Sequence, residues 1–269
     1  MPHPLDGARA KLQRAEESIQ NLGRDIEAFF GNEPKPYKII KQHQKGGLEY
    51  AFLAAGEPEV PLRFSVLIGE VIHHLRSSLD HLLYALVIRN GQAPSRKHQF
   101  PICETKEAFE NARKNGAVDG VSSAAEKLIM DVQPFTSATP DDTVLYVIHQ
   151  YDIFDKHRLL VVVTAVAGLS ETIHIGVDSK IAALPERKGK KPNIVGFHFP
   201  KPQKISKEGT VIAAIQMAEP APELIADAKL VPQLAFEKCG RVAFALALPT
   251  LRGLLMGTQH TIENFSGEF

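Results

Sequence analysis

The spacing of apolar residues changes near Gly168, and this change constrains the fold more than any other feature of the chain. Before Gly168, apolar residues recur every three or four positions, which is the period of an amphipathic helix. After it, apolar and polar residues alternate between clusters of Pro, Gly and Lys, which is typical of β-strands. The sequence therefore predicts an α+β fold, with helices and an antiparallel sheet built from different stretches.

Long helices are predicted wherever the helical period persists and suitable residues stand at its ends. Pro61 precedes the second of them, and Thr139 and Pro140 stand at the cap and first turn of the third, which we expect to reach Val166. The chain closes with another helix that starts near Leu248. The predicted helices cover residues 5–30, 61–87, 106–114, 122–132, 139–166 and 248–269.

The predicted strands lie in two parts of the chain. Two β-rich runs flank Gly46 and Gly47, and a Gly-Gly turn between such runs indicates a hairpin over residues 37–55. The remaining strands follow Gly168 and are bounded by Pro, Gly and Lys clusters. They are predicted within residues 171–178, 193–200, 209–218 and 228–237.

We expect these elements to form a helical bundle core of long antiparallel helices, with an N-terminal β-hairpin and a C-terminal antiparallel sheet. Residues 1–168 would form a helical domain that carries the hairpin at 37–55. Residues 169–247 would form the antiparallel β region, and the helix at 248–269 would pack back on the core. This division follows the change from helical to strand-like spacing of the apolar residues.

Charge gives no general attraction to nucleic acid or to an anionic membrane. The 31 Lys and Arg residues equal the 31 Asp and Glu residues, so any nucleic-acid role needs a local patch. The basic loop over residues 186–192 is one such stretch, and a solvated connection is the simpler interpretation of it.

The two cysteines, Cys103 and Cys239, are far apart and lack the paired spacing of a zinc site or a redox motif, so we interpret them as reduced structural thiols. The charged N-terminal sequence has no apolar stretch of a signal peptide. The longest apolar run, residues 159–169, is too short to span a bilayer, which needs about 20 residues. The sequence predicts a cytoplasmic protein without a membrane span or a cofactor.

Two helices carry polar residues close to their apolar stripes. In the second helix, polar side chains flank the stripe on both sides, and in the third the stripe runs directly through Asp152 and Asp155. An ionised carboxylate is costly to bury without a partner, so we expect the two helices to meet where these groups lie. Three explanations are open: a structural network with Arg76 or a histidine, a catalytic or ligand-binding pocket, or a metal site made from Asp152, Asp155 and one of His74, His81 and His149.

Arg76 and His81 stand five positions apart in the second helix, with Ser77 after the arginine and Tyr84 three places beyond the histidine. This pattern resembles the Arg-x4-His active-site motif of HEPN domains, helical bundles found in toxins and defence ribonucleases. The resemblance covers the helical part of the chain, residues 1–168. It implies a metal-independent endoribonuclease that acts as a homodimer, because the motifs of two subunits face each other in that family.

The residue types suit such a reaction, because imidazole exchanges protons near neutral pH and guanidinium binds phosphate. His81 would be the general acid or base, Arg76 would clamp the phosphate, and Asp80 and Asp155 would orient them. RNA is the implied partner. Further residues predicted to line or support the site are His74, Tyr84, Asp152, Asp155, Lys156, His157 and Arg158.

Two functions of other classes compete with this one. A non-catalytic interaction or ligand-binding protein would use the same Arg, Asp and His groups as a structural network. A metal-dependent hydrolase would need several of them gathered around one ion. The position of Arg76 separates these alternatives, since a monomer with Arg76 buried against Asp155 favours the structural role, whereas a dimer with Arg76 and His81 paired favours the nuclease.

Overall fold

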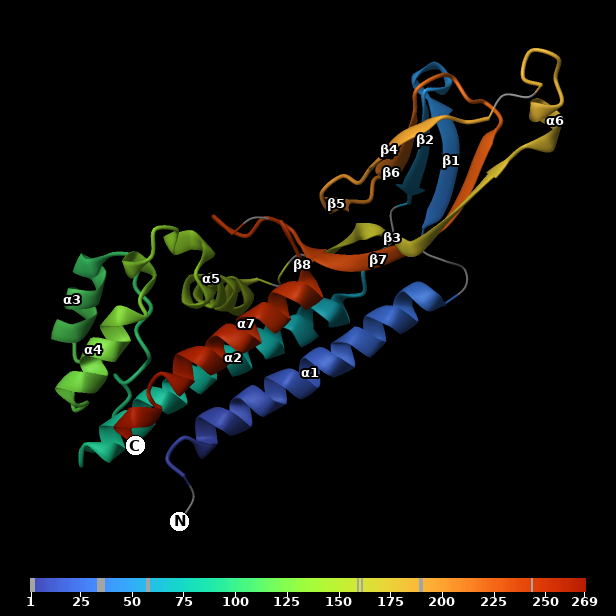
Figure 1. Cartoon of the computed structure of the whole chain (residues 1–269). Helices are drawn as coiled ribbons and strands as arrows, with labels where there is room; N and C mark the ends of the chain where they lie inside the picture. The colour runs from blue at the N-terminus through green and yellow to red at the C-terminus, as the bar shows by residue number, and fades with distance from the viewer. Residues whose placement is uncertain are drawn as a thin grey trace. The chain divides into compact units, whose positions relative to one another are not determined.

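The computed structural model describes residues 3–32, 37–56, 59–158, 160, 162–188, 191–242 and 244–269, with only the backbone described for residues 166–172 and 228–230. The chain forms two compact units (Figure 1). The helical unit comprises Met1–Asp25, Pro61–Val162 and Phe236–Phe269, and the sheet unit comprises Ile26–Val60 and Val163–Ala235. The predicted α+β class is confirmed. Each unit is assembled from separated stretches, whereas the sequence analysis divided the chain into consecutive ones.

Side-chain caps fix the start of three helices in the helical unit. Thr105, Ser122 and Thr143 each accept a hydrogen bond from a backbone N–H in the first turn of the helix that follows, which satisfies a donor that the helix leaves free. The helices that belong wholly or largely to this unit are α1 (Asp6–Gly31), α2 (Leu62–Arg89), α3 (Lys106–Lys114), α4 (Ser123–Asp131), α5 (Val144–His157) and α7 (Ala247–Glu263), with 3-10 turns at Pro134–Thr136, Pro140–Asp142 and Ser266–Glu268 and the short strand β8 (Ala245–Leu246).

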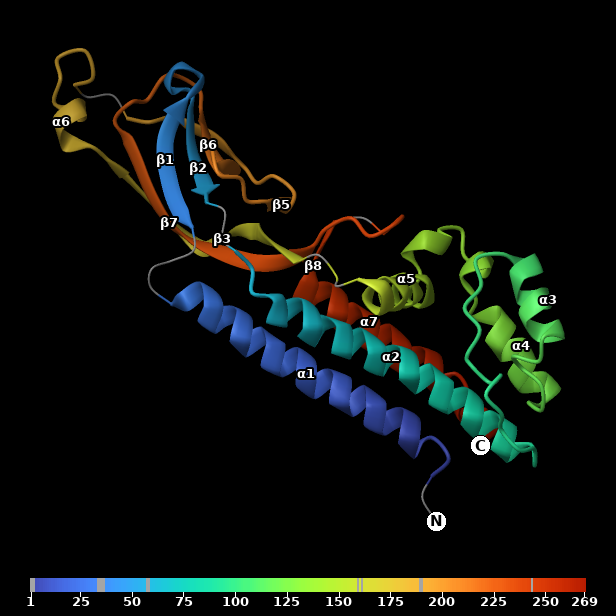
Figure 2. The ribbon, with the colours of Figure 1, turned by 180° about the vertical axis from the view of Figure 1, so that it is seen from behind.

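The core of the helical unit lies around α2. This helix contacts α5 and α7, and the two views show α1, α2 and α7 running side by side (Figures 1 and 2). The predicted stripe of α2 is confirmed, because all its members are at most 2% exposed; they are Ile68, Ile72, Leu75, Leu79, Leu82 and Leu86. None of the helices in the described part of the chain is both long and apolar enough to cross a bilayer.

The sheet unit contains antiparallel strands. One sheet has the order β1 (Lys38–Gln44), β2 (Glu49–Ala55), β6 (Thr210–Met217) and β4 (Ile194–His198). The predicted hairpin is confirmed, since β1 pairs with β2 in the register Lys38↔Ala55 to Gln44↔Glu49. Positive φ angles at Lys45, Gly46 and Gly47 make the turn, and two glycines suit it because they adopt this region without a steric penalty.

A second sheet places β3 (Val162–Val177) between β5 (Gln203–Lys204) and β7 (Leu224–Phe236). The short helix α6 (Ser179–Ala182) follows β3, and the Asp178 side chain caps it. Large apolar side chains from β2, β6 and β7 fill the core of the sheet unit, which includes Tyr50, Phe52, Ile215 and Leu224. Every residue of β2 is buried, because this strand has a neighbour on each side and packing on both faces.

The prediction for the third long helix was wrong at both ends. Pro140–Asp142 forms a separate 3-10 turn, α5 begins after Thr143, and it ends at His157 instead of Val166. The strand β3 already begins at Val162, where β-branched residues follow one another and favour an extended backbone. Leu159, which the prediction placed on the same helical stripe, lies outside the described residues.

Candidate functional site

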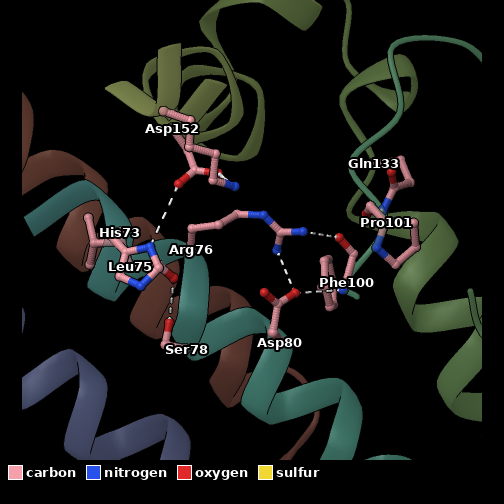
Figure 3. Close-up of polar contacts among 10 residues, drawn as sticks. His73, Leu75, Arg76, Ser78, Asp80, Phe100, Pro101, Gln133 and Asp152 are labelled. Atoms are coloured by element: carbon pink, nitrogen blue, oxygen red, sulfur yellow. Dashed lines mark hydrogen bonds and ion pairs between the residues drawn. The ribbon is translucent and has the colours of Figure 1, made fainter. Parts of the chain in front are cut away.

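On one flank of α2, Arg76 and Asp80 hold the loop that follows the helix. Arg76 Nη2 donates to the carbonyl oxygen of Phe100 at 2.7 Å, and the Phe100 backbone N–H donates to Asp80 Oδ1 at 2.8 Å. Arg76 Nη1 and Asp80 Oδ1 are 2.9 Å apart and close the ring of contacts (Figure 3). The Arg76 side chain is only 12% exposed. The two charged groups therefore satisfy both backbone polar groups of one residue while they neutralise each other.

Gln133 holds the same loop from the opposite side. Its amide nitrogen donates to the carbonyl oxygens of Pro101 and Ile129, each at 2.9 Å, and its amide oxygen accepts from the Cys103 N–H at 2.8 Å. The Phe100 ring is 1% exposed. These contacts make Arg76 and Asp80 part of a structural clamp. The predicted network instead paired Arg76 with Asp152 and Asp155, whereas the carboxylate that Arg76 contacts here is Asp80.

His81 lies apart from this clamp. Gly7 of α1 packs against it so closely that a Cβ atom on Gly7 would be 2.7 Å from His81 Nδ1. Residues five positions apart on a helix point about 140° away from each other, so a single chain does not bring Arg76 and His81 together. Tyr84 is also elsewhere, and its hydroxyl donates to the Ser95 carbonyl oxygen at 3.2 Å.

The other flank of α2 faces a hollow of about 510 Å³, which we call the histidine hollow. It lies between α1, α2 and α5 and is lined mostly by charged or titratable side chains. Four of the residues predicted from sequence meet here: His74, Asp152, Asp155 and Lys156. The complete lining is Arg14, Val66, Gly69, Glu70, His73, His74, Asp152, Asp155 and Lys156.

Asp152 links the two helices that form the hollow. Its side chain is 5% exposed, as the inward direction predicted from sequence requires. Lys156 Nζ donates to Asp152 Oδ2 at 2.6 Å. His73 Nδ1 lies 4.0 Å from Asp152 Oδ1, so the two form an ion pair when the imidazole is protonated (Figure 3). Asp152 therefore neutralises Lys156 and faces His73 across the gap between α2 and α5.

Asp155 occupies space that only a glycine on α2 leaves open. A Cβ atom on Gly69 would collide with the Asp155 carboxylate. Asp155 Oδ1 is buried and has no hydrogen-bond partner. Burial, and to a lesser degree the charge of Asp152, raises the pKa of Asp155 above its ordinary value. Asp155 is therefore a carboxylate that the surrounding protein leaves unsatisfied.

His74 is similarly unsatisfied. Its Nδ1 atom is buried and lacks a hydrogen-bond partner. Burial lowers the pKa of His74 below 6.5, and the nearby charges of Lys11, His73 and Arg14 lower it further. The imidazole is consequently neutral at pH 7 and able to accept a proton. Perturbed groups of this kind in a hollow are typical of functional sites.

The part of the chain that the structure describes contains no set of ligands for a metal ion. Within those residues, His, Cys, Asp and Glu side chains do not gather in groups of three or more that could hold an ion. His149, which the metal alternative included, does not line the histidine hollow. Burial and the charge of Arg76 lower the pKa of His149.

Six residues of the predicted site do not line the hollow: Arg76, Asp80, His81 and Tyr84, described above, and His157 and Arg158. Several residues that do line it were not predicted. His157 and Arg158 are exposed, and the Arg158 guanidinium lies 4.2 Å from the centre of the Phe154 ring. The missed residues are Arg14, Val66, Gly69, Glu70 and His73. One signal was available for them, because an isolated glycine at position 69 inside a strong helical pattern indicates a packing or functional requirement.

No protein-family model, no curated protein and no solved structure matches this chain.

Proposed function

We propose that this protein is a metal-independent endoribonuclease whose acid and base groups lie in the histidine hollow. The observation that carries the proposal is the meeting of His73 and His74 with Asp155 and Lys156 in one hollow. Imidazole and carboxylate groups supply proton transfer without a metal. Arg14 and Lys156 add cations at the rim, where a phosphate needs them.

The proposed reaction is transesterification at an RNA phosphodiester. His74, which is neutral at pH 7, takes the proton from the ribose 2′-hydroxyl, and the 2′-oxygen then forms a bond to phosphorus. The bond between phosphorus and the 5′-oxygen breaks, and protonated His73 donates a proton to that oxygen. The products are a 2′,3′-cyclic phosphate and a free 5′-hydroxyl. Asp152 orients His73, and Lys156 offsets the charge that develops on the phosphoryl oxygens.

The Arg76 and His81 pair is the competing location for the same chemistry, at a seam between two subunits. His81 is exposed, so a second copy of the chain can reach it. Arg76 would first have to release Asp80 and the Phe100 carbonyl oxygen, and breaking a largely buried charge pair is costly. We therefore favour the histidine hollow, with a homodimer and a cytoplasmic location as further parts of the proposal. The free cysteines Cys103 and Cys239 fit a reducing compartment.

Ligand binding without catalysis is the second candidate function. Asp155 favours it, because its buried oxygen lacks a partner and faces the same hollow. A bound hydrogen-bond donor would satisfy that oxygen. This alternative predicts that the functional protein binds a ligand in the hollow and does not cleave RNA.

The test is cleavage of a mixed-sequence single-stranded RNA in EDTA by the wild type and by His74→Gln. We expect His74→Gln to lower the rate about 100-fold or more, which is the usual contribution of a general base. The matched control is His81→Gln, a histidine of the same helix that is exposed and outside the hollow. The wild-type rate should rise with pH through the pKa of His74, which lies below 6.5, and DNA of the same sequence should not be cut because it lacks the 2′-hydroxyl.

The outcomes of this test distinguish the histidine hollow, the Arg-x4-His motif and ligand binding without catalysis. If His81→Gln abolishes cleavage and His74→Gln does not, the reaction belongs to the Arg-x4-His motif and the hollow is not the active site. If the wild type itself leaves RNA intact, the ribonuclease proposal is overturned and ligand binding is the better account of the hollow.

A further inference from the structure

The sheet unit contains a strongly basic stretch in a protein whose charges otherwise balance. Residues 187–207 hold seven Lys or Arg residues and no Asp or Glu. The stretch includes β4 and the segments on both sides of it. A local excess of this size attracts polyanions even when the whole protein is neutral.

Three apolar side chains of this stretch point into solvent. Val195, Phe197 and Phe199 are 63%, 48% and 55% exposed. Val195 lies at a shift in the β4–β6 register, and Phe199 directly follows β4. The rings of Phe197 and Phe199 are nearly parallel, with an interplanar angle of 9° and centroids 6.5 Å apart. Exposed aromatic rings that gather in this way indicate a binding surface.

The position of β4 leaves these rings accessible. β4 is the last strand in the order β1-β2-β6-β4 and pairs with β6 (Figure 1). Edge strands are usually protected from association by charges or by cover. Here Lys191 and Lys201 are exposed in the same stretch as the rings, and residues 187–207 contain no carboxylate side chain.

The first residue of the basic stretch, Arg187, is held by contacts within the sheet unit. Arg187 forms an ion pair with Glu223, whose side chain is fully buried. The backbone N–H of Asp178 donates to the Glu223 carbonyl oxygen at 2.7 Å. Arg187 is therefore occupied by an internal partner, and Lys191 and Lys201, which are exposed, are the cations that we assign to a ligand.

We propose that β4 and its flanks bind single-stranded RNA, with bases stacked on Phe197 and Phe199 and phosphates held by Lys191 and Lys201. Aromatic faces beside a basic track are the combination that single-stranded nucleic acids require, because bases stack and the backbone is anionic. We name this stretch the β4 surface. The choice of RNA over DNA rests on the proposed ribonuclease function, whereas the stacking and the charge contacts do not.

The experiment measures the affinity of the full-length protein for a fluorescent 2′-O-methyl oligouridine by anisotropy. This probe lacks the 2′-hydroxyl, so binding is measured without cleavage and a failure of the ribonuclease proposal leaves the result interpretable. We expect Phe197→Leu combined with Phe199→Leu to weaken binding at least about tenfold, since stacking is lost while the apolar volume is largely kept. Lys191→Gln combined with Lys201→Gln should reduce the slope of log affinity against log salt concentration by about 1.4.

The matched control is Lys38→Gln combined with Ile40→Ala on β1, the opposite edge of the same sheet, where both residues are exposed. This control should bind as tightly as the wild type. The proposal is overturned if the wild type does not bind the oligonucleotide at low salt, or if the phenylalanine variant, shown to be folded by circular dichroism, binds as tightly as the control. Binding of the β4 surface to anionic lipid vesicles but not to the oligonucleotide would equally overturn it.

Discussion

The polar residues on the two flanks of α2 differ in the contacts that they make. On the first flank, Arg76 and Asp80 form an ion pair and hydrogen-bond both backbone groups of Phe100, although Arg76 Nη1 makes no hydrogen bond beyond that ion pair. On the second, Asp155 and His74 each have a buried atom without a hydrogen-bond partner. Both flanks belong to one helix and to one unit, so the difference lies in what each set of side chains is arranged to contact.

This difference teaches how to separate structural from functional polar residues. A network whose charges are paired and whose contacts fix a loop stabilises the fold. Unsatisfied groups reduce stability, and chains retain them mainly at functional sites. The histidine hollow adds a second local cost, because Gly69 stands in a helix interior where alanine would be more stable by about 1 kcal/mol.

Removing Arg76 gives the largest expected effect and tests the first flank. In Arg76→Ala, Asp80 loses its ion-pair partner and the Phe100 carbonyl oxygen loses its hydrogen-bond donor, so we expect the free energy of unfolding to fall by about 2–3 kcal/mol. Urea unfolding measures this loss of free energy. The control is Arg9→Ala, whose pair with Asp6 is exposed and 3.8 Å long, so its removal should cost less than about 0.5 kcal/mol. Equal losses in the two variants would show that the clamp does not stabilise the fold.

A double-mutant cycle between Gly69 and Asp155 tests the second flank. With Asp155→Ala in place, Gly69→Ala should stabilise by about 1 kcal/mol, because the helix gains a better helix former. With Asp155 present the gain should disappear, because the new methyl group displaces the carboxylate, and the coupling energy should reach about 1 kcal/mol.

Gly253 supplies the control for this cycle. It lies inside α7 with no atom near the position of a Cβ, so Gly253→Ala should stabilise equally with and without Asp155. Additive effects at Gly69 would mean that the close approach of Asp155 to α2 is not maintained in solution.

The smallest expected effect is the pH dependence contributed by Asp155, since this side chain is only half-buried and water screens its charge. Its folded pKa lies above the ordinary value of 3.8. The carboxyl group therefore contributes stability that is present below pH 3.8 and is lost as the pH rises through the folded pKa. Asp155→Asn should gain stability relative to the wild type as the pH rises above 3.8 and through the folded pKa, as followed by urea unfolding. A constant difference over that pH range would contradict the burial of this carboxylate.

The period of apolar residues was sufficient to predict the α2 stripe, the β1–β2 hairpin and the α+β class, because burial of one face dictates each of them. The end of α5 was not predicted, since apolar spacing alone does not distinguish a continued helix from a run of β-branched residues that begins a strand. Val162 and Val163 fit either pattern.

The candidate site could be predicted only in part for a similar reason. Asp152 and Asp155 stood out as carboxylates in an apolar stripe, and they do lie in the histidine hollow. Arg76 donates to a backbone carbonyl oxygen 24 residues further along the chain. Every residue has a backbone carbonyl group, so this partner could not be predicted from residue types. Arg14 comes from a helix whose alignment with α2 is set by packing, which the sequence of either helix does not encode alone.

The separated stretches of the helical unit have a consequence for how the protein is made. α2 ends at Arg89, and α7, which packs on it, begins at Ala247, so roughly 8–30 seconds of synthesis separate these two helices at ordinary translation rates. The residues of the sheet unit, Ile26–Val60 and Val163–Ala235, have all been synthesised before α7 begins. We expect the sheet unit to fold before α7 emerges. α5 is available to α2 earlier, so only the side of α2 that packs on α7 stays exposed until translation is nearly finished.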